Sequence, residues 1–325
     1  MSQSVHATSP APLPPDHPFA PFVAARGLVV VDGALATELE ARGADLADPL
    51  WSARVLLEQP NLIRQVHADY FAAGADIAIA ATYQATFEGF AVRGIRADHA
   101  AALMHQAVTL ACEARDAWMA RSGAGADRPR PLVAASVGPY GASLADGSEY
   151  RGDYTVDEDA LLEWHRERFA ILAASGADLL ACETLPCGAE ARAILRLLDA
   201  TPQARACITF SARDDARISS GERFDTLAAL VGAHPQVVAV GVNCTAPNHV
   251  APLIRAARAC TAAPVIVYPN SGETYDGVTR RWTRPVSCAP YAEMAREWRD
   301  AGAVAIGGCC RTTPADIASI VAQLP

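Results

Sequence analysis

The 325-residue sequence lacks any apolar run that approaches the roughly 18 residues needed to span a bilayer. It also lacks an excess of positive charge, because 27 Lys and Arg residues stand against 36 Asp and Glu residues, for a formal net charge of −9. The first absence argues against a membrane protein, and the second argues against nucleic acid or an anionic membrane as a partner. A hydrophobic content of 51% instead indicates a globular protein with a large core.

Several common motifs are also missing. There is no C-x-x-C pair, and nine cysteines in a long chain do not suit a secreted disulfide framework, so we expect a reduced, cytoplasmic protein. Residues 1–24 are rich in Pro and Ala but lack the basic start and continuous apolar core of a signal peptide, and we expect a flexible tail there. No G-x-G-x-x-G sequence follows the first predicted strand, so the usual nucleotide-binding fold is not expected.

Eight short apolar runs alternate with longer amphipathic segments along the rest of the chain. Residues 62–73, for example, have the apolar spacing of a helix, and Gly74, Gly176 and Gly302 stand where a left-handed helix end is expected. This alternation predicts that residues 25–325 form a single α/β domain, a (β/α)8 TIM barrel. A doubly wound open sheet is the alternative, but it usually has fewer strands. The predicted strands are residues 28–31, 77–81, 132–137, 178–182, 206–210, 237–244, 265–268 and 304–306.

Two adjacent cysteines, Cys309 and Cys310, follow the eighth run, and Cys244 ends the sixth. Neighbouring side chains of a regular strand point to opposite faces. We expect Gly307 and Gly308 to take backbone angles closed to other residues, so that both thiols face one target. In a barrel the strand ends converge, and three thiolates there suit a zinc ion with its fourth position open. The alternative is that these cysteines are buried core residues.

Carboxylates and free amides also follow the predicted strands. Asp32 and Glu183 are suited to bind an ammonium group, and the amides of Gly33 and Ala34 open a predicted helix, where a carboxylate can bind. The alternatives are that Asp32 caps this helix and that Glu183 is a buried carboxylate satisfied inside the protein.

Three thiolates make zinc a poor generator of hydroxide but suit a fourth sulfur ligand. A substrate thiol bound there is deprotonated, and the simplest reaction of the resulting thiolate is attack on a methyl group. A metal-assisted hydrolase, with Asp32 or Glu183 activating water, is a weaker hypothesis because the strand ends beside the cysteines offer no histidine ligand. A zinc-binding or thiol-binding protein without turnover is the third hypothesis.

Long motifs carry a resemblance to a known family. They include V-D-G-A-L-A-T-E-L-E-A-R-G (31–43), L-A-D-G-S-E-Y-R-G-D-Y (144–154), G-V-N-C (241–244) and I-G-G-C-C-R-T-T-P-A-D-I (306–317). Over nearly the whole chain after the tail, the sequence resembles the zinc-dependent homocysteine S-methyltransferase family, most of all its bacterial S-methylmethionine:homocysteine methyltransferases. The resemblance implies methyl transfer from S-methylmethionine to the thiolate of L-homocysteine, giving methionine, with S-adenosylmethionine as a second candidate donor.

The resemblance also implies roles for individual residues. Asp32 and Glu183 would engage the amino end of homocysteine, with the amides of Gly33 and Ala34 near its carboxylate. Many relatives have glycine where this chain has Ala34. The ligands of one Zn²⁺ ion per chain would be Cys244, Cys309 and Cys310. Further residues lining the pocket would be Thr82, Gln84 and Asn243.

Two long connections, residues 139–157 and 269–290, are expected to act as lids or binding loops. Their aromatic side chains are suited to a sulfonium donor, whose positive charge is attracted to an aromatic face. The chain ends at Pro325, short of the C-terminal extension of the betaine-using branch of the family. This disfavours betaine as the donor and predicts a monomer.

Overall fold

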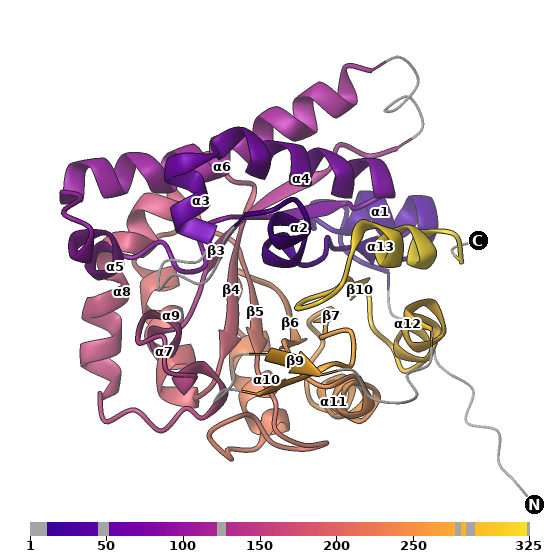
Figure 1. The fold of residues 1–325 in the computed structure, drawn as a ribbon. Coiled ribbons are helices and arrows are strands. Elements are labelled where there is room, and N and C mark those ends of the chain that lie inside the picture. Colours follow the sequence, from indigo (N-terminus) through magenta and orange to yellow (C-terminus); the bar gives the residue numbers. More distant parts are fainter. Residues whose placement is uncertain (1–11, 45–51, 122–127, 277–280, 284–289, 324–325) are drawn as a thin grey trace, which may run out of the picture.

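The computed structural model describes residues 12–44, 52–121, 128–276, 281–283 and 290–323. Its main sheet consists of eight parallel strands: β1 (Val29–Val30), β2 (Ile77–Ala80), β3 (Leu132–Val137), β4 (Leu179–Leu185), β5 (Ala206–Phe210), β6 (Val237–Asn243), β7 (Val265–Tyr268) and β10 (Ala305–Ile306). Their spatial order is β1-β10-β7-β6-β5-β4-β3-β2, and a parallel bridge between Val31 and Ile77 joins the two ends of this order. The sheet therefore closes, the predicted TIM barrel is confirmed, and the open sheet is wrong (Figure 1).

Helices surround the strands in Figure 1. They are α1 (Ala20–Arg26), α2 (Leu35–Ala41), α3 (Ser52–Glu58), α4 (Pro60–Ala73), α5 (Phe87–Val92), α6 (Ala97–Met119), α7 (Tyr140–Ser143), α8 (Glu158–Ala173), α9 (Gly188–Asp199), α10 (Phe224–Gly232), α11 (Pro247–Cys260), α12 (Tyr291–Asp300) and α13 (Pro314–Val321). The predicted helix over residues 62–73 lies within α4. Gly74, Gly176 and Gly302, each between a helix and the next strand, have φ values of 107°, 87° and 111°, as expected for left-handed helix ends.

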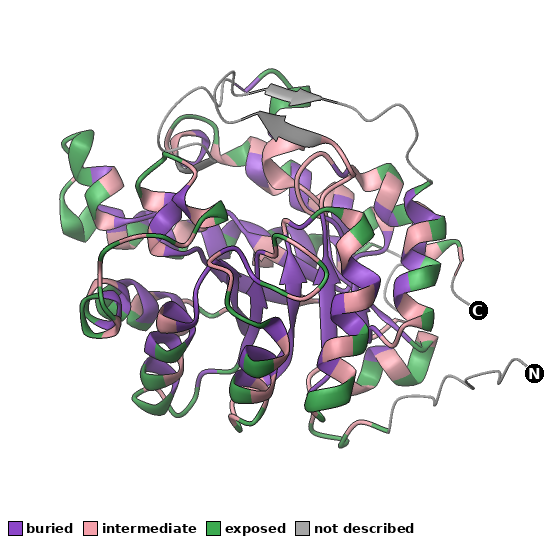
Figure 2. Cartoon of the chain, turned by 90° about the horizontal axis from the view of Figure 1, so that it is seen from below, coloured by how far each residue is buried: buried purple, intermediate pink, exposed green. Residues whose placement is uncertain are grey.

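Alternate side chains of each strand pack into two separate layers. In β1, Val29 packs with Ile266 and Ala305 in the barrel interior, whereas Val30 packs in the outer layer between strands and helices. Figure 2 shows the strands as buried and the surrounding helices as a mixture of buried, intermediate and exposed residues. The strands are therefore apolar on both faces, and polar groups are concentrated where the strands end.

Helix α1 packs against the barrel. Phe19, just before it, and Phe22 within it are 0% and 1% exposed, and both pack with the side chains of the barrel interior near the strand starts. This packing contradicts the predicted flexible tail for residues 19–24, because two large aromatic side chains gain more from burial than the segment loses in chain entropy. Residues 1–11 of the predicted tail lie outside the described residues.

Paired carboxylates lie at the N-terminal ends of the strands. Asp76, directly before β2, accepts a hydrogen bond of 2.9 Å from the main-chain N–H of Val30 and forms salt bridges with Arg26 and Arg128. Asp178, directly before β4, repeats the arrangement with a main-chain N–H of β3 and an arginine of α6. These acids tie neighbouring strands together at the start of the barrel.

Both long connections contain local structure. Residues 139–157 include α7 and a 3₁₀ helix, Ser148–Tyr150, and residues 269–290 include an antiparallel pair, β8 (Thr274–Asp276) and β9 (Arg281–Thr283). The remainder of the second connection lies partly outside the described residues. Within the described ranges, no helix is both long enough and apolar enough to cross a bilayer.

Candidate active site

Three thiols meet at the C-terminal ends of the strands. Cys244 follows β6 directly, and Cys309 and Cys310 follow β10. The Sγ atom of Cys310 lies 3.7 Å from that of Cys244 and 4.0 Å from that of Cys309, and the sulfurs of Cys244 and Cys309 are paired as a disulfide. In the part of the chain that the structure describes, this is the one cluster of three or more potential ligands that could hold a metal ion.

The spacing of these thiols fits one tetrahedral metal ion. A zinc ion about 2.3 Å from each sulfur would set its sulfur ligands about 3.8 Å apart, close to the two distances made by Cys310. Ligation needs both Cys244 and Cys309 as thiolates, so the ion and the bond between these two sulfurs exclude one another. An all-sulfur donor set favours zinc or another thiophilic metal over a hard cation.

The glycine pair before the cysteines serves close packing. Neither Gly307 nor Gly308 has a positive φ, so the predicted role in unusual backbone angles is wrong. A Cβ atom at Gly307 would lie 2.5 Å from Cβ of Val31, and one at Gly308 would overlap the side chain of Thr312. Glycine thus lets the end of β10 approach the end of β1. Because β10 ends at Ile306, strand alternation no longer separates the two thiols.

Strained backbone is concentrated around the thiols. Apart from glycine, the described residues with positive φ are Ala145 and three site residues: Thr184 at 61°, Cys244 at 45° and Arg311 at 68°. Such conformations are costly for residues with a Cβ atom, most of all for a β-branched threonine. The fold therefore holds the segments after β6 and β10, and the end of β4, in geometries that local preference disfavours.

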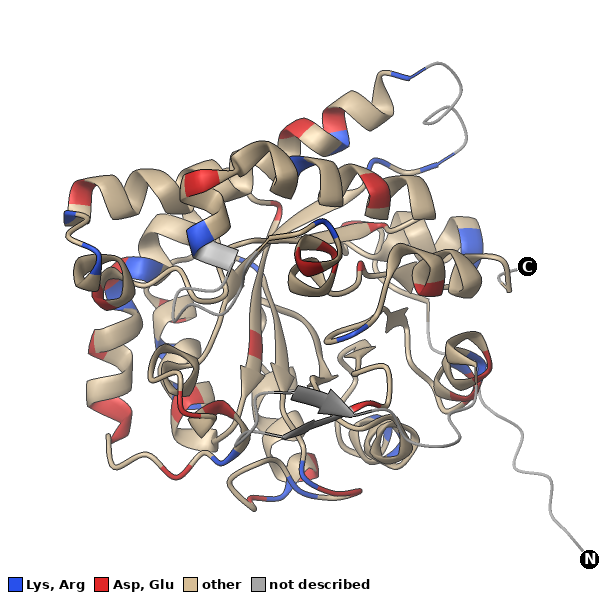
Figure 3. Cartoon of the chain, in the orientation of Figure 1, with Lys and Arg blue, Asp and Glu red and all other residues tan. Residues whose placement is uncertain are grey.

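Two carboxylates at the same end of the barrel are buried and lack a salt-bridge partner in the described part of the chain. Asp32 is 2% exposed and Glu183 is 6% exposed, and among the described residues neither forms a salt bridge. Burial, with a smaller contribution from the charge of Glu183, raises the pKa of Asp32 well above its usual range. Burial raises the pKa of Glu183 to about 7, although hydrogen bonds from Ser136 and Tyr268 and, least, the positive charge of Arg168 oppose the shift. Figure 3 shows how rarely charge occurs on the strands, since most charged residues lie on the helices and loops.

The contacts of Asp32 bear on its predicted alternative role. Its Oδ2 atom accepts a hydrogen bond of 2.9 Å from the main-chain N–H of Ile79. Helix α2 begins after Ala34, and no side chain caps it. The alternative that Asp32 caps this helix is therefore wrong.

Asn243 holds the end of β4 in place. Its Oδ1 atom accepts hydrogen bonds from the Thr184 N–H at 2.7 Å and from the Thr209 hydroxyl at 2.8 Å, and its Nδ2 atom donates to the Thr184 hydroxyl at 2.7 Å. These bonds stabilise the positive φ of Thr184, the residue that follows Glu183. The amide of Asn243 thus acts on Glu183 through the backbone.

The other predicted pocket residues differ in how many of their polar groups are already hydrogen-bonded. The Thr82 hydroxyl donates to the Ser136 carbonyl at 2.7 Å, and the Ala34 N–H donates to the Thr312 hydroxyl at 3.2 Å. Gln84 donates from Nε2 to the Ala142 carbonyl at 3.3 Å, but its buried Oε1 atom has no hydrogen-bond partner among the described residues. A buried acceptor of this kind is suited to a ligand donor.

The family model for homocysteine S-methyltransferases matches residues 29–324. The chain belongs to the homocysteine S-methyltransferase family. It is 52% identical to a homocysteine S-methyltransferase of Bacillus subtilis over 91% of this chain and 94% of the relative, and 48% identical to one of Escherichia coli over 95% and 99%. The metallated form of the E. coli homocysteine methyltransferase MmuM superposes with a TM-score of 0.83 at 47% identity, covering 93% of this chain and 98% of that one.

Membership of the homocysteine S-methyltransferase family makes this protein an enzyme that transfers a methyl group to homocysteine. Solved structures of the E. coli relative are described as metallated, oxidized and apo. The thiol cluster of this chain could hold a metal ion.

The sequence reasoning missed three polar residues inside the strands of this methyltransferase barrel. The hydroxyls of Ser136 and Tyr268 bond Glu183, and Tyr268 also lies 2.8 Å from the hydroxyl of Thr209. Each of these residues is a polar side chain within an otherwise apolar predicted strand. That contrast is the signal that could have identified them.

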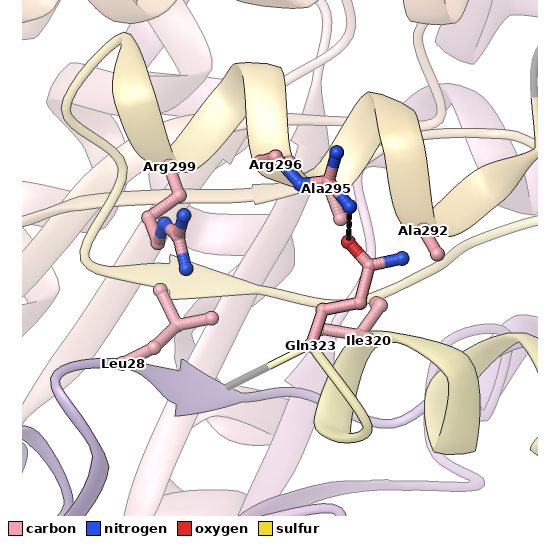
Figure 4. A pocket seen from close by; sticks show the side chains of 7 residues that line it. All are labelled: Leu28, Ala292, Ala295, Arg296, Arg299, Ile320 and Gln323. Carbon is pink, nitrogen blue, oxygen red and sulfur yellow. Dashed lines mark hydrogen bonds between the residues drawn. The ribbon is translucent and has the colours of Figure 1, made fainter. Parts of the chain in front are cut away.

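A small hollow of the methyltransferase lies away from the thiols, between α12, α13 and Leu28 (Figure 4). Arg296 and Gln323 join across it through a hydrogen bond of 2.7 Å. Its volume is about 10 Å³, which is no more than one water molecule needs. This hollow is therefore too small for an amino-acid substrate.

Proposed function

We propose that the enzyme transfers a methyl group from S-methylmethionine to the sulfur of L-homocysteine, with one zinc ion held by Cys244, Cys309 and Cys310. The observation that carries this proposal is the three-thiol cluster at the same barrel end as two buried, unpaired carboxylates. The cluster suits a thiophilic metal, and the carboxylates suit the ammonium group of an amino-acid substrate.

A zinc ion in this donor set would supply a position at which a fourth sulfur ligand is deprotonated at neutral pH. The chain's own residues then bind homocysteine and orient it. We assign the ammonium group of homocysteine to Asp32 and Glu183, and its carboxylate to the N–H of Gly33, because the Ala34 N–H is already bonded to Thr312.

The raised pKa values of the two acids support this assignment. A buried carboxylate without a counter-ion is costly, so it favours its protonated form. An arriving ammonium group supplies the missing positive charge, lowers both pKa values and gains a charge-assisted hydrogen bond. The unpaired acids thus favour a cationic amino group over a neutral analogue.

Methyl transfer from a sulfonium to a thiolate forms one carbon–sulfur bond and breaks another, without moving a proton at the methyl carbon. No general base is needed for that step, and positioning supplies the rate. We assign Gln84 to donor or acceptor binding because its Oε1 atom is free, and Thr82 and Asn243 to positioning the strand ends. S-Adenosylmethionine is a candidate second donor.

The test is methionine formation from homocysteine with S-methylmethionine, betaine or S-adenosylmethionine, with and without a zinc chelator. We expect chelator-sensitive turnover with S-methylmethionine. Cys310→Ala should lose bound zinc and activity while the barrel stays folded, whereas Cys260→Ala, at an exposed cysteine on α11, should keep both. Full activity in metal-free protein would contradict the proposed role of zinc. Turnover with betaine alone would contradict S-methylmethionine as the methyl donor.

We also infer a cytoplasmic location, because ligation requires reduced thiols. Monomeric assembly stays a prediction from the sequence, to be checked by light scattering.

A further inference from the structure

Glu149 lies in the 3₁₀ helix Ser148–Tyr150, in the connection between β3 and α8. Its Oε2 atom is buried and has no hydrogen-bond partner among the described residues. The main chain around it is held from two sides. Its carbonyl accepts a hydrogen bond of 2.9 Å from the Ser211 hydroxyl, and a Cβ atom at Gly141 would lie 2.6 Å from its nitrogen. The position of Glu149 is thus built into the fold.

Glu149 belongs to a segment that reaches the thiol cluster. Burial raises the pKa of the Cys310 thiol and that of the Tyr83 hydroxyl, and the negative charge of Glu149 adds to both shifts. The adjacent residue, Tyr150, makes a hydrogen bond to Cys310. The segment that carries Glu149 therefore lies against the site at which the methyl group moves.

The local cation does not neutralise Glu149. The guanidinium group of Arg151 donates to the Asp146 carbonyl at 2.9 Å and to Asp153 at 3.3 Å. Burial raises the pKa of Glu149, and Arg151 opposes this shift only weakly. A buried carboxylate oxygen without a partner is costly to keep, and the role proposed above for Asp32 and Glu183 does not use it.

We propose that Glu149 is the counter-ion of the sulfonium group of the methyl donor. This inference rests on the proposed function. A sulfonium has no N–H or O–H to donate, so the protein can recognise it only by charge and by contact with aromatic faces. A carboxylate beside Cys310 provides that charge next to the reacting sulfur.

The same contact discriminates donor from product. When the methyl group leaves, the sulfonium sulfur becomes a neutral thioether, and its attraction to Glu149 disappears. The site then binds the cationic donor more tightly than the methionine formed from it. Glu149 thereby helps the donor to compete with product at the same position.

The test compares Glu149→Gln with Asp153→Asn in zinc-loaded protein. Both substitutions remove one negative charge from the same connection, but Asp153 is exposed and bonds Arg151. We expect Glu149→Gln to raise the KM for S-methylmethionine about tenfold, or about 1.4 kcal/mol. The KM for homocysteine, the zinc content and inhibition by methionine should change less than about twofold, and Asp153→Asn should change none of them.

A binding measurement makes the assignment specific. Calorimetric titration without homocysteine should show weaker binding of both S-methylmethionine and trimethylsulfonium, which carries the sulfonium charge but no amino group, to Glu149→Gln. Weakening for S-methylmethionine alone would assign Glu149 to the donor's ammonium group and overturn the proposal.

Two further outcomes separate this proposal from the proposed function. Wild-type turnover of S-methylmethionine with unchanged donor KM in Glu149→Gln would overturn only the role of Glu149. Absence of turnover and of sulfonium binding in zinc-loaded wild type would overturn both.

Discussion

The two ends of the barrel treat buried carboxylates in opposite ways. At the N-terminal end, Asp76 is 0% exposed and forms salt bridges with Arg26 and Arg128. At the C-terminal end, Asp32 is 2% exposed and Glu183 is 6% exposed, and no salt bridge to either is found in the described part of the chain. Burial is therefore similar at both ends, and the difference lies in the counter-ions.

The difference separates acids that stabilise the fold from acids that are candidates for ligand binding. A buried carboxylate that meets arginines and a strand N–H is stabilised by groups of its own chain. A buried carboxylate left without a cation is a cost that the rest of the fold must offset, and such sites are candidates for ligand binding. The chain contains no lysine, so arginine is the only strong side-chain cation it can place at either end.

Removal of the paired acid should have the largest effect. Asp76→Ala leaves two arginines and the Val30 N–H without their acceptor, and we expect a loss of about 3–5 kcal/mol in the free energy of unfolding. Chemical denaturation measures this loss. The KM for homocysteine in the folded fraction should not change. A loss below about 1 kcal/mol would show that water replaces the carboxylate, and it would contradict the stabilising role given to the acids at the N-terminal end of the barrel.

Removal of the unpaired acid should act on substrate binding instead. Asp32→Asn keeps an acceptor for the Ile79 N–H but removes the charge, so we expect kcat/KM for homocysteine to fall about 100-fold, or about 3 kcal/mol. The free energy of unfolding should stay constant or rise, because a desolvated charge is lost. Steady-state kinetics together with denaturation separates the two effects. Equal losses in stability for Asp32→Asn and Asp76→Ala would contradict the proposed division of roles.

The pH dependence of stability tests whether Glu183 is protonated in the folded protein. The pKa of Glu183 is raised from 4.5 to about 7 in the folded protein, so the folded state holds a proton that the unfolded chain releases. The stability that the protonated Glu183 contributes is thus fully present below pH about 4.5 and is lost as the pH rises toward 7. Glu183→Gln in metal-free protein should remove this fall, which amounts to at most about 3 kcal/mol. Denaturation between pH 5 and 8 tests this, and parallel curves for both proteins would show that the pKa is not raised.

Much of the architecture could be predicted from local sequence. Each predicted apolar run overlaps one observed strand, and Gly74, Gly176 and Gly302 end their segments with positive φ as expected. These features follow from apolar periodicity and from the freedom of glycine, both of which are local. The role of Gly307 and Gly308 could not be predicted this way, because the side chains they accommodate, Val31 and Thr312, are identified only by packing.

The candidate site could be predicted only in part, in its cysteines but not in its hydrogen-bond partners. The cysteines at strand ends were found because a barrel brings such positions together, whatever the details of packing. The partners of Asn243, which are Thr184 and Thr209, lie 59 and 34 residues away. No motif reveals such contacts, so the part that Asn243 plays in holding a strained backbone could not be predicted, whereas its contact with substrate stays a prediction.

The sequence by itself therefore determined the barrel, its order of strands and helices, and the three thiols, since these depend on periodicity and on residue type at strand ends. Only the tertiary structure decided which acids have counter-ions. Asp32 and Asp76 both stand at strand boundaries in the sequence, but Arg26 reaches Asp76 across 50 positions of the chain and no arginine forms a salt bridge with Asp32 in the described part. Charge pairing depends on distance in space, and the closure of the barrel sets that distance.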